Sequence, residues 1–347
     1  MAERLVLTRA AKAQTAKEED KWGFVPTGST LLDLGLGGGW ALGRAVNLVG
    51  DSSAGKTLLA IEAAANFARL YGIKNARYNE SENAFIRSYA ETVGLPAGLQ
   101  FVGDDAEREV DRHGSATVED FQADFEAFIK SRHNSKPSFY VLDSFDALEA
   151  AKELKRDFGD RQPGAKAALS SEFYRTHISD IAAANCLLMI ISQTREAIGV
   201  MFGETKTRSG GKAHDFFASQ IVWLSTGRQI KGKVAGVERT VGTHTIFNVK
   251  KNKLGKPYAR ANLVIHYNYG IDDELSNIEW LKDNKLGAAG RLTLKIDEYA
   301  DAITDVRAQR DIETLKQMSD ELKQAVRIRW EEIDAAAAPP LKKYELG

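Results

Sequence analysis

Short apolar runs alternate along most of the chain with longer segments whose apolar residues recur at helical spacing. The runs are rich in aliphatic and aromatic residues, as expected of strands buried on both faces of a sheet. They cover residues 45–49, 139–142 and 187–191. The helical segments cover residues 58–71, 118–133 and 167–184. Because strands and helices alternate, the pattern predicts an α/β fold with a mostly parallel central sheet flanked by helices.

The two ends of the chain depart from this pattern. Residues 1–24 are charged and rich in alanine, and we interpret them as an N-terminal arm that offers a subunit contact. Residues 25–269 hold the alternating core, and residues 270–347 are expected to form a small, α-rich C-terminal domain with a tail. Apolar residues at helical spacing in that domain either pack within it or contact a partner. They are Ile312, Leu315, Leu322, Val326, Trp330 and Ile333.

Composition narrows the class of protein. The 47 basic and 48 acidic residues give a formal net charge of -1, so any nucleic-acid surface must be a local patch. The single cysteine, Cys186, excludes an internal disulfide and a cysteine-based zinc site, and it fits a reducing cytosol. No apolar run approaches the ~18 residues of a membrane span, and residues 1–20 lack a signal-peptide core. We therefore expect a cytoplasmic protein rather than a secreted or membrane protein.

A phosphate-binding loop is the strongest chemical motif in the sequence. Residues 50–57 match the pattern G-x-x-x-x-G-K-[ST], with an apolar strand before the match and a helix after it. They are Gly50, Asp51, Ser52, Ser53, Ala54, Gly55, Lys56 and Thr57. The glycines let backbone N–H groups point at a phosphate, and the helix N-terminus adds its positive end. We expect Lys56 to reach the β- and γ-phosphates and Thr57 to ligate Mg²⁺.

Three acidic residues complete the candidate chemistry. Asp143 ends an apolar strand, where a carboxylate holds Mg²⁺ in nucleotide hydrolases, although it could also cap the next helix. Glu80 and Glu82 follow the apolar stretch at residues 76–78, and either could position the attacking water. ATP is favoured over GTP because the nearest match to the guanine-reading motif Asn-Lys-x-Asp, at residues 252–255, lacks the aspartate.

Several further segments resemble signatures of the RecA family of recombination ATPases, over roughly residues 25–285. They are residues 27–33, 143–144, 147–148, 198–203, 210–211, 216–219 and 251–253. Residues 227–231 and the short N-terminal arm look closer to recombinases of large phages. The resemblance implies that the protein is located in the cytoplasm of a bacterium or of a phage-infected bacterial cell.

The resemblance also implies roles for individual residues. Glu82 aligns with the catalytic glutamate that activates water, Gln193 with a sensor of the γ-phosphate, and Tyr89 with an aromatic that stacks on adenine. Lys251 and Lys253 align with lysines that reach a neighbouring subunit's ATP and neutralise transition-state charge. The sequence departs from the family's pattern at three positions. Glu80 replaces a usual aspartate, Asn83 a common histidine and Ile86 a carboxylate that often meets the adenine amino group.

Two basic, glycine-containing segments, residues 152–166 and 195–212, align with the family's two DNA-binding loops. By charge alone, each would be interpreted as a solvated loop. The candidates for DNA contact are Arg161, Lys166, Arg195, Met201, Phe202, Lys206, Arg208, Gly210, Gly211 and Lys212. Met201 and Phe202 either insert between bases or anchor the loop on the protein. Residues 228–260 carry nine basic residues and one acidic residue, and they either track phosphates or line a subunit interface.

Together, motifs and resemblance imply an ATP- and Mg²⁺-dependent DNA recombinase that hydrolyses ATP to ADP and phosphate. It would form a helical filament on single-stranded DNA and pair that strand with a homologous duplex during recombination and repair. Loading or single-strand-binding proteins would be further partners. Two alternatives stay open: a ring helicase motor of the same fold, and an ATP-binding accessory protein without strand exchange.

Overall fold

The computed structural model describes residues 23–83, 86–104, 114–132, 137–154, 164–196, 206–208, 210, 212–284 and 296–337, with the backbone alone for Glu196 and Lys206. Its central sheet has ten strands, ordered β12–β11–β10–β9–β3–β7–β6–β4–β5, with β8 paired to β7. The strands are β3 (Ala45–Gly50), β4 (Ala76–Glu80), β5 (Gln100–Phe101), β6 (Ser138–Asp143), β7 (Cys186–Glu196), β8 (Lys206–Arg208), β9 (Gln220–Val234), β10 (Val237–Asn252), β11 (Arg260–His266) and β12 (Gly270–Ile271). A separate pair consists of β1 (Phe24–Val25) and β2 (Trp40–Ala41).

From β9 to β5, neighbouring strands of this order run parallel, whereas β8 pairs antiparallel with β7. The centre of this parallel half is formed by β3, β7 and β6, the three strands that the apolar runs predict, with β4 beside them. The predicted α/β class with a mostly parallel sheet is therefore confirmed. Between β9 and β12 the strands run antiparallel, so the sheet as a whole is mixed.

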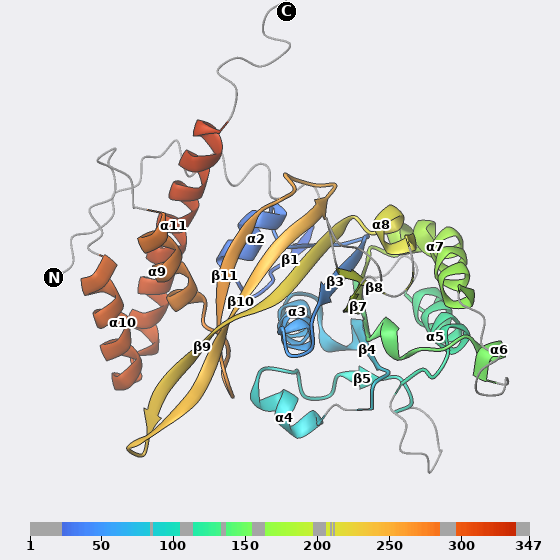
Figure 1. Cartoon of the computed structure of the whole chain (residues 1–347), viewed down its shortest axis with the longest axis horizontal. Helices are drawn as coiled ribbons and strands as arrows, with labels where there is room; N and C mark the ends of the chain where they lie inside the picture. Colours follow the sequence, from blue (N-terminus) through green and yellow to red (C-terminus); the bar gives the residue numbers. More distant parts are fainter. Residues whose placement is uncertain are drawn as a thin grey trace, which may run out of the picture. The chain divides into compact units, whose positions relative to one another are not determined.

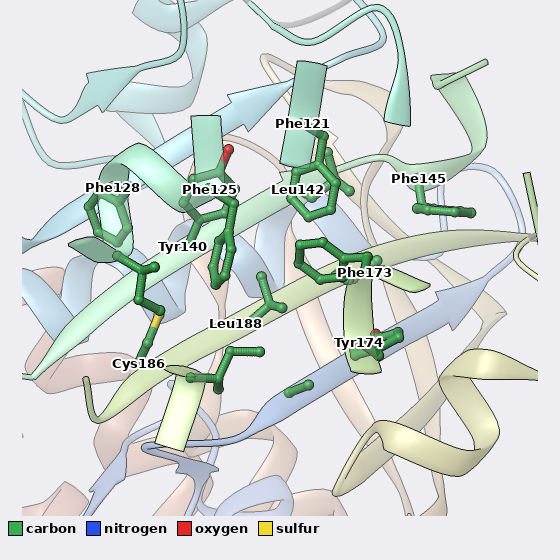
Figure 2. Close-up of a cluster of buried hydrophobic side chains, with 14 of the residues drawn as sticks. Phe121, Phe125, Phe128, Tyr140, Leu142, Phe145, Phe173, Tyr174, Cys186 and Leu188 are labelled. Carbon is green, nitrogen blue, oxygen red and sulfur yellow. The ribbon is translucent and has the colours of Figure 1, made fainter. Parts of the chain in front are cut away.

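Helices cover both faces of the parallel half, as alternate strand residues require (Figure 1). On one face, Phe67 of α3 (Lys56–Tyr71) packs on Phe139 of β6, with ring centroids 5.5 Å apart. On the other face, Tyr140 of β6 packs on Phe125 of α5 (Val118–Lys130), with centroids 5.3 Å apart. Figure 2 shows this second cluster, in which Phe173 of α7 (Ala165–Ala183) joins the aromatic group.

Shorter helices connect these layers. They are α2 (Thr30–Leu36), α4 (Arg87–Thr92), α6 (Ala151–Leu154) and α8 (Ala213–Phe217), with the 3-10 turns η2 (Ile73–Asn75) and η3 (Phe145–Ala147). No described helix combines the length and apolarity that a membrane span requires. Cys186, at the start of β7, is fully buried, and burial raises the pKa of its thiol to about 12.

The chain divides into two compact units between Ile271 and Asp272. The C-terminal unit contains α9 (Asp273–Asp283), α10 (Ile296–Gln309) and α11 (Ile312–Ala336). In α11 the middle of the predicted apolar stripe is buried at Leu322 and Val326. Trp330 stacks on Trp280 of α9 with centroids 5.5 Å apart, whereas Ile312 is 78% exposed. The middle of the stripe therefore packs within its own unit, whereas its first and last residues, Ile312 and Ile333, are exposed.

Strands β9 and β10 continue past the rest of the sheet as a two-stranded ribbon (Figure 1). Strand β11 pairs with β10 only between Gly242 and Asn248, and Gly242 pairs with Ile230 of β9, so residues 231–241 lie beyond β11. Ala235 and Gly236 both have positive φ, at 50° and 82°, and make the two-residue turn at the tip. We define the outer ribbon as residues 228–241, which include this part and hold the first part of the basic stretch that the sequence indicates.

Candidate functional site

The phosphate-binding loop lies at the carboxyl end of β3, the central strand of the parallel half. Two of its glycines are required by geometry. A Cβ on Gly50 would lie 2.6 Å from the carbonyl oxygen of Leu224 in β9, closer than packed atoms allow. Gly55 is the N-cap residue of α3 and has φ at 90°, in the left-handed region that favours glycine. The loop therefore ends with the N-terminus of a 16-residue helix facing the site, as anion binding requires.

Lys56 is the first residue of α3, and its ammonium group lies within the loop. Its Nζ donates to the carbonyl oxygens of Gly50 and Asp51, at 3.0 and 2.6 Å. Burial lowers the pKa of Lys56, while the carboxylates of Asp143 and Glu82 raise it. The cation is thus placed where phosphate oxygens would meet the loop N–H groups.

Asp143 ends β6 and lies directly beside α3. Its Oδ2 accepts hydrogen bonds from the hydroxyls of Thr57 and Tyr78, both at 2.8 Å. Burial raises the pKa of Asp143 to about 6, and the two hydrogen bonds oppose that rise. The described residues contain no group of three or more His, Cys, Asp or Glu that could hold a metal alone. An oxygen pair from Thr57 and Asp143 instead fits Mg²⁺, which keeps most of its ligands as water and phosphate.

Glu82 follows β4, and its carboxylate meets residues from two neighbouring strands. Its Oε1 accepts hydrogen bonds from Ser144 Oγ at 2.6 Å and from Gln193 Nε2 at 2.8 Å. Glu80, at the end of β4, is buried, and its Oε1 accepts the backbone N–H of Glu82 at 3.1 Å. The two glutamates therefore differ in placement: Glu80 supports the turn, and Glu82 contacts the polar ends of β6 and β7.

A cavity of about 440 Å³ extends from the phosphate-binding loop. Its lining includes Lys56 and Thr57 at one end and the apolar residues Ile86, Val93 and Ile265 elsewhere. Tyr89 also lines it and is 51% exposed, so its ring is accessible to a planar base. The cavity combines a phosphate end with an apolar end, as a nucleotide requires.

Lys251 and Lys253, at the end of β10, are not among the residues that line this cavity. The Nζ of Lys251 donates to the carbonyl oxygens of Asp215 and Phe216 in α8, the second at 3.1 Å. Burial and the nearby charge of Lys253 lower the pKa of Lys251. Within one chain, the two lysines therefore lie apart from the cavity that Lys56 and Thr57 line.

Comparison with known proteins gives the family. The family model of the RecA N-terminal domain matches residues 10–272, well over half of the chain. The chain belongs to the RecA family. It is 33% identical to the RecA protein of Staphylococcus carnosus over 72% of this chain and 65% of that protein. It is 34% identical to RecA of Mycoplasma pneumoniae over 76% of this chain and 74% of that protein. A 29% match to RecA of Streptococcus gordonii covers 90% of this chain and 78% of that protein. The chain thus spans about two thirds to three quarters of the length of these relatives.

The residues that align with the RecA family's DNA loops differ in their exposure and in their hydrogen-bond partners. Lys166 donates to the carbonyl oxygens of Asp146 and Leu148, at 3.0 and 2.5 Å, and burial lowers its pKa to about 8. Arg195 is 61% exposed. Lys212 is also exposed. Arg208 is buried and pairs with Asp215 at 2.5 Å, so it supports the start of α8 rather than facing solvent.

Gly210 also has a structural task, because a Cβ there would lie 2.4 Å from Nε2 of His214. The Nδ1 of His214 in turn meets the hydroxyl of Tyr174 at 2.8 Å. Burial lowers the pKa of His214 to about 3, which keeps the imidazole neutral. The remaining candidates, Arg161, Met201, Phe202 and Gly211, and the side chain of Lys206, lie outside the described residues.

Two residues of the site, Tyr78 and Asp146, have no signal in the sequence alone, and Ser144 is indicated only as part of the family signature at residues 143–144. Tyr78 is indistinguishable from a core residue of β4, yet its hydroxyl bonds Asp143. Ser144 follows Asp143, and its hydroxyl donates to Glu82. Asp146 accepts the N–H of Gln193 at 2.6 Å. Each contact joins two segments, in a strand or directly after one, that are far apart in the chain. The order of parallel strands, which places β4, β6 and β7 side by side, is the only signal that could have indicated them.

Proposed function

We propose that this RecA-family protein is an ATP-dependent DNA recombinase that assembles on single-stranded DNA and exchanges strands with a homologous duplex. One observation carries the proposal. Glu82, Ser144 and Gln193 meet at the ends of three adjacent parallel strands, beside the phosphate-binding loop. Gln193 belongs to β7, the strand that also leads to Arg195. The residue that contacts Glu82 and a candidate for DNA contact therefore lie on the same strand.

In the hydrolysis step, Glu82 would accept a proton from the attacking water. Its Oε1 is held by two donors, Ser144 and Gln193, which fixes the direction of the carboxylate. Lys56 would neutralise charge on the phosphates, and the N–H groups at the start of α3 would bind them. Mg²⁺, held by Thr57 and Asp143, would supply further neutralisation when bound with the nucleotide. Tyr89 would orient the base at the apolar end of the cavity.

DNA would be bound by exposed cations near the end of β7 and after it, with Arg195 and Lys212 as the described candidates. Because phosphate contacts by Lys and Arg do not depend on sequence, such a site suits strands of any sequence. Lys251 and Lys253 would act on the ATP of a neighbouring copy in a helical filament, since they lie apart from the cavity of their own chain. Filament growth would then complete the catalytic site between subunits.

The decisive experiment compares ATP hydrolysis with and without single-stranded DNA for the wild type and Glu82→Gln. Glu172→Gln, an exposed change on α7, is the matched control. We expect DNA to stimulate the wild type and the control equally. Glu82→Gln should bind ATP normally and turn over at least about 100-fold more slowly, the usual contribution of a general base. Unchanged turnover in Glu82→Gln contradicts this assignment.

Strand exchange and electron microscopy separate the recombinase from its alternatives. A recombinase pairs homologous strands and forms open filaments with ATP. A closed ring that separates strands would instead indicate a helicase motor. ATP binding without DNA-stimulated turnover or exchange would indicate an accessory protein.

A further inference from the structure

Asp146 contacts residues from both proposed DNA loops and from the nucleotide site. It lies in η3, directly after β6. Its Oδ2 accepts the backbone N–H of Gln193 at 2.6 Å, and its Oδ1 lies 3.4 Å from Nη2 of Arg195. Its backbone carbonyl accepts a hydrogen bond from Nζ of Lys166 at 3.0 Å. One residue thus meets the proposed γ-phosphate sensor and two basic residues.

Gln193 is held on two sides by different carboxylates. Its side chain donates to Glu82 at 2.8 Å, and its backbone N–H donates to Asp146. When the side chain changes partner, any accompanying movement of the backbone acts on Asp146. Arg195 lies two residues farther along β7 and meets the other oxygen of that carboxylate. A change at Gln193 therefore has a short physical route to Arg195.

Asp146 also competes with DNA for Arg195. The carboxylate is only 8% exposed, whereas the guanidinium is 61% exposed and reaches solvent. Arginine forms strong charge-assisted hydrogen bonds with phosphate as well as with carboxylate. As long as Asp146 holds Arg195, less positive charge is offered to a DNA strand.

We propose that Asp146 is a positioning residue that couples the nucleotide site to DNA affinity. It restrains Arg195 while Gln193 keeps the arrangement described above, and it releases Arg195 when Gln193 moves. The inference rests on the proposed function, because it requires nucleotide-dependent binding of single-stranded DNA. In thermodynamic terms, Asp146 carries part of the coupling free energy between the two sites.

The test measures binding of a fluorescent oligothymidylate by anisotropy, with ADP and with a non-hydrolysable ATP analogue, over a range of salt concentrations. The full chain is used as wild type, Asp146→Ala, Asp146→Asn and the control Glu172→Gln. Wild type and control should bind at least about fivefold more tightly with the analogue, the lower end of typical coupling. With ADP, Asp146→Ala should bind the oligonucleotide more tightly than the wild type does. The slope of log affinity against log salt concentration should be steeper by about 0.7, as expected when one further phosphate is neutralised. For this variant, the ratio of the DNA affinity with the ATP analogue to the DNA affinity with ADP should fall below about twofold.

Asp146→Asn keeps an acceptor for Gln193 and loses the charge, so its ratio should lie between those of wild type and Asp146→Ala. An unchanged ratio in Asp146→Ala overturns the inference. Equal weakening in both nucleotide states also overturns it, because that is the effect of a purely structural residue. If thermal unfolding shows that the alanine variant is not folded, the ratio and salt slope of the asparagine variant decide.

A double-mutant cycle with Arg195→Ala tests the route. In that background, Asp146→Ala should change the affinity with ADP by less than about twofold, because the restrained group is gone. A change as large as in the wild-type background contradicts the inference. A wild type that binds DNA without regard to nucleotide overturns the proposed function itself. Nucleotide dependence that survives Asp146→Ala overturns only this inference.

Discussion

Asp143 is a residue whose placement favours function over stability. Burial raises the pKa of its carboxyl from the usual 3.8 to about 6. Between these values the folded protein binds this proton more tightly than the unfolded chain does. The stability contributed by the group is therefore full below about pH 4 and is lost as the pH rises through about 6. At neutral pH, an ionised carboxylate is kept in a buried position, where a metal ion can use it.

We predict that Asp143→Asn stabilises the nucleotide-free protein at pH 8. The rise of the pKa from 3.8 to about 6 corresponds to about 3 kcal/mol of unfolding free energy. The amide oxygen can still accept from Thr57 and Tyr78, so up to that amount should be gained at pH 8 and about half of it at pH 5. Denaturant unfolding at the two pH values measures the difference. An equal gain in unfolding free energy at both pH values would contradict the raised pKa of Asp143. Whatever the gain, the Asp143→Asn variant should lose ATP hydrolysis.

Glu80 acts on Glu82 through the backbone, and its role can be separated from catalysis. Removing the acceptor of the Glu82 N–H in Glu80→Ala should lower kcat by about tenfold and leave KM for ATP nearly unchanged, the effect of one hydrogen bond. Glu80→Gln keeps an acceptor and should stay within about threefold of wild type. Steady-state kinetics, with melting temperatures as the check on folding, give the result. Full activity in Glu80→Ala would show that the turn at Glu82 keeps its conformation without the hydrogen bond to Glu80.

At this scale the sequence predicted residue types better than residue partners. The motif at residues 50–57 and Asp143, at the end of a strand, could be recognised from the local sequence pattern. The reason is that one loop and one strand set their spacing. The choice between Glu80 and Glu82 could not be made locally. The family resemblance favours Glu82, and the contacts that distinguish Glu82 from Glu80, with Ser144 and Gln193, form only after the sheet is assembled.

At the scale of elements, the outer ribbon of β9 and β10 gives a testable surface. Arg228 and Lys233 are exposed on it, while Lys231 pairs with Glu238 at 3.1 Å. If the ribbon follows DNA phosphates, Arg228→Ala with Lys233→Ala should weaken DNA binding and lower the salt slope by about 0.7 for each phosphate that is no longer neutralised. Lys74→Ala is the control, because Lys74 is exposed in η2, directly before β4 and away from the outer ribbon. An unchanged slope in the double variant would remove the ribbon from the DNA surface.

The ribbon is also the element that the sequence indicated least well. Central strands such as β6 are recognisable because both faces are buried and nearly every residue is apolar. Most of residues 229–241 are exposed, so neither face imposes an apolar period, and only the charge was visible. The C-terminal helix gives the intermediate case. Its stripe is buried at Leu322 and Val326, whereas Ile312 and Ile333, near its two ends, are exposed, so a partner contact at those residues stays a prediction.

For the whole molecule, the division after Ile271 predicts two separable unfolding events. Trp330 stacks on Trp280 within the C-terminal unit, so Trp330→Ala should destabilise that unit by about 2 kcal/mol, less than for a fully buried tryptophan. An ATP analogue should raise the melting temperature of the other unit only, because ligand binding stabilises the part that binds. Calorimetry with and without the analogue measures both effects. A single transition that shifts as one would show that the units unfold together.

The burial of Cys186 has a practical consequence for experiments on assembly. A thiol that is fully buried, with its pKa raised to about 12, does not react with maleimides in the native protein. A cysteine introduced at the exposed tip of the ribbon, as in Val237→Cys, would then be the labelled position without removal of the native one. A fluorophore attached there would report, by quenching or energy transfer, how the ribbon's surroundings change when copies of the chain gather on a DNA strand.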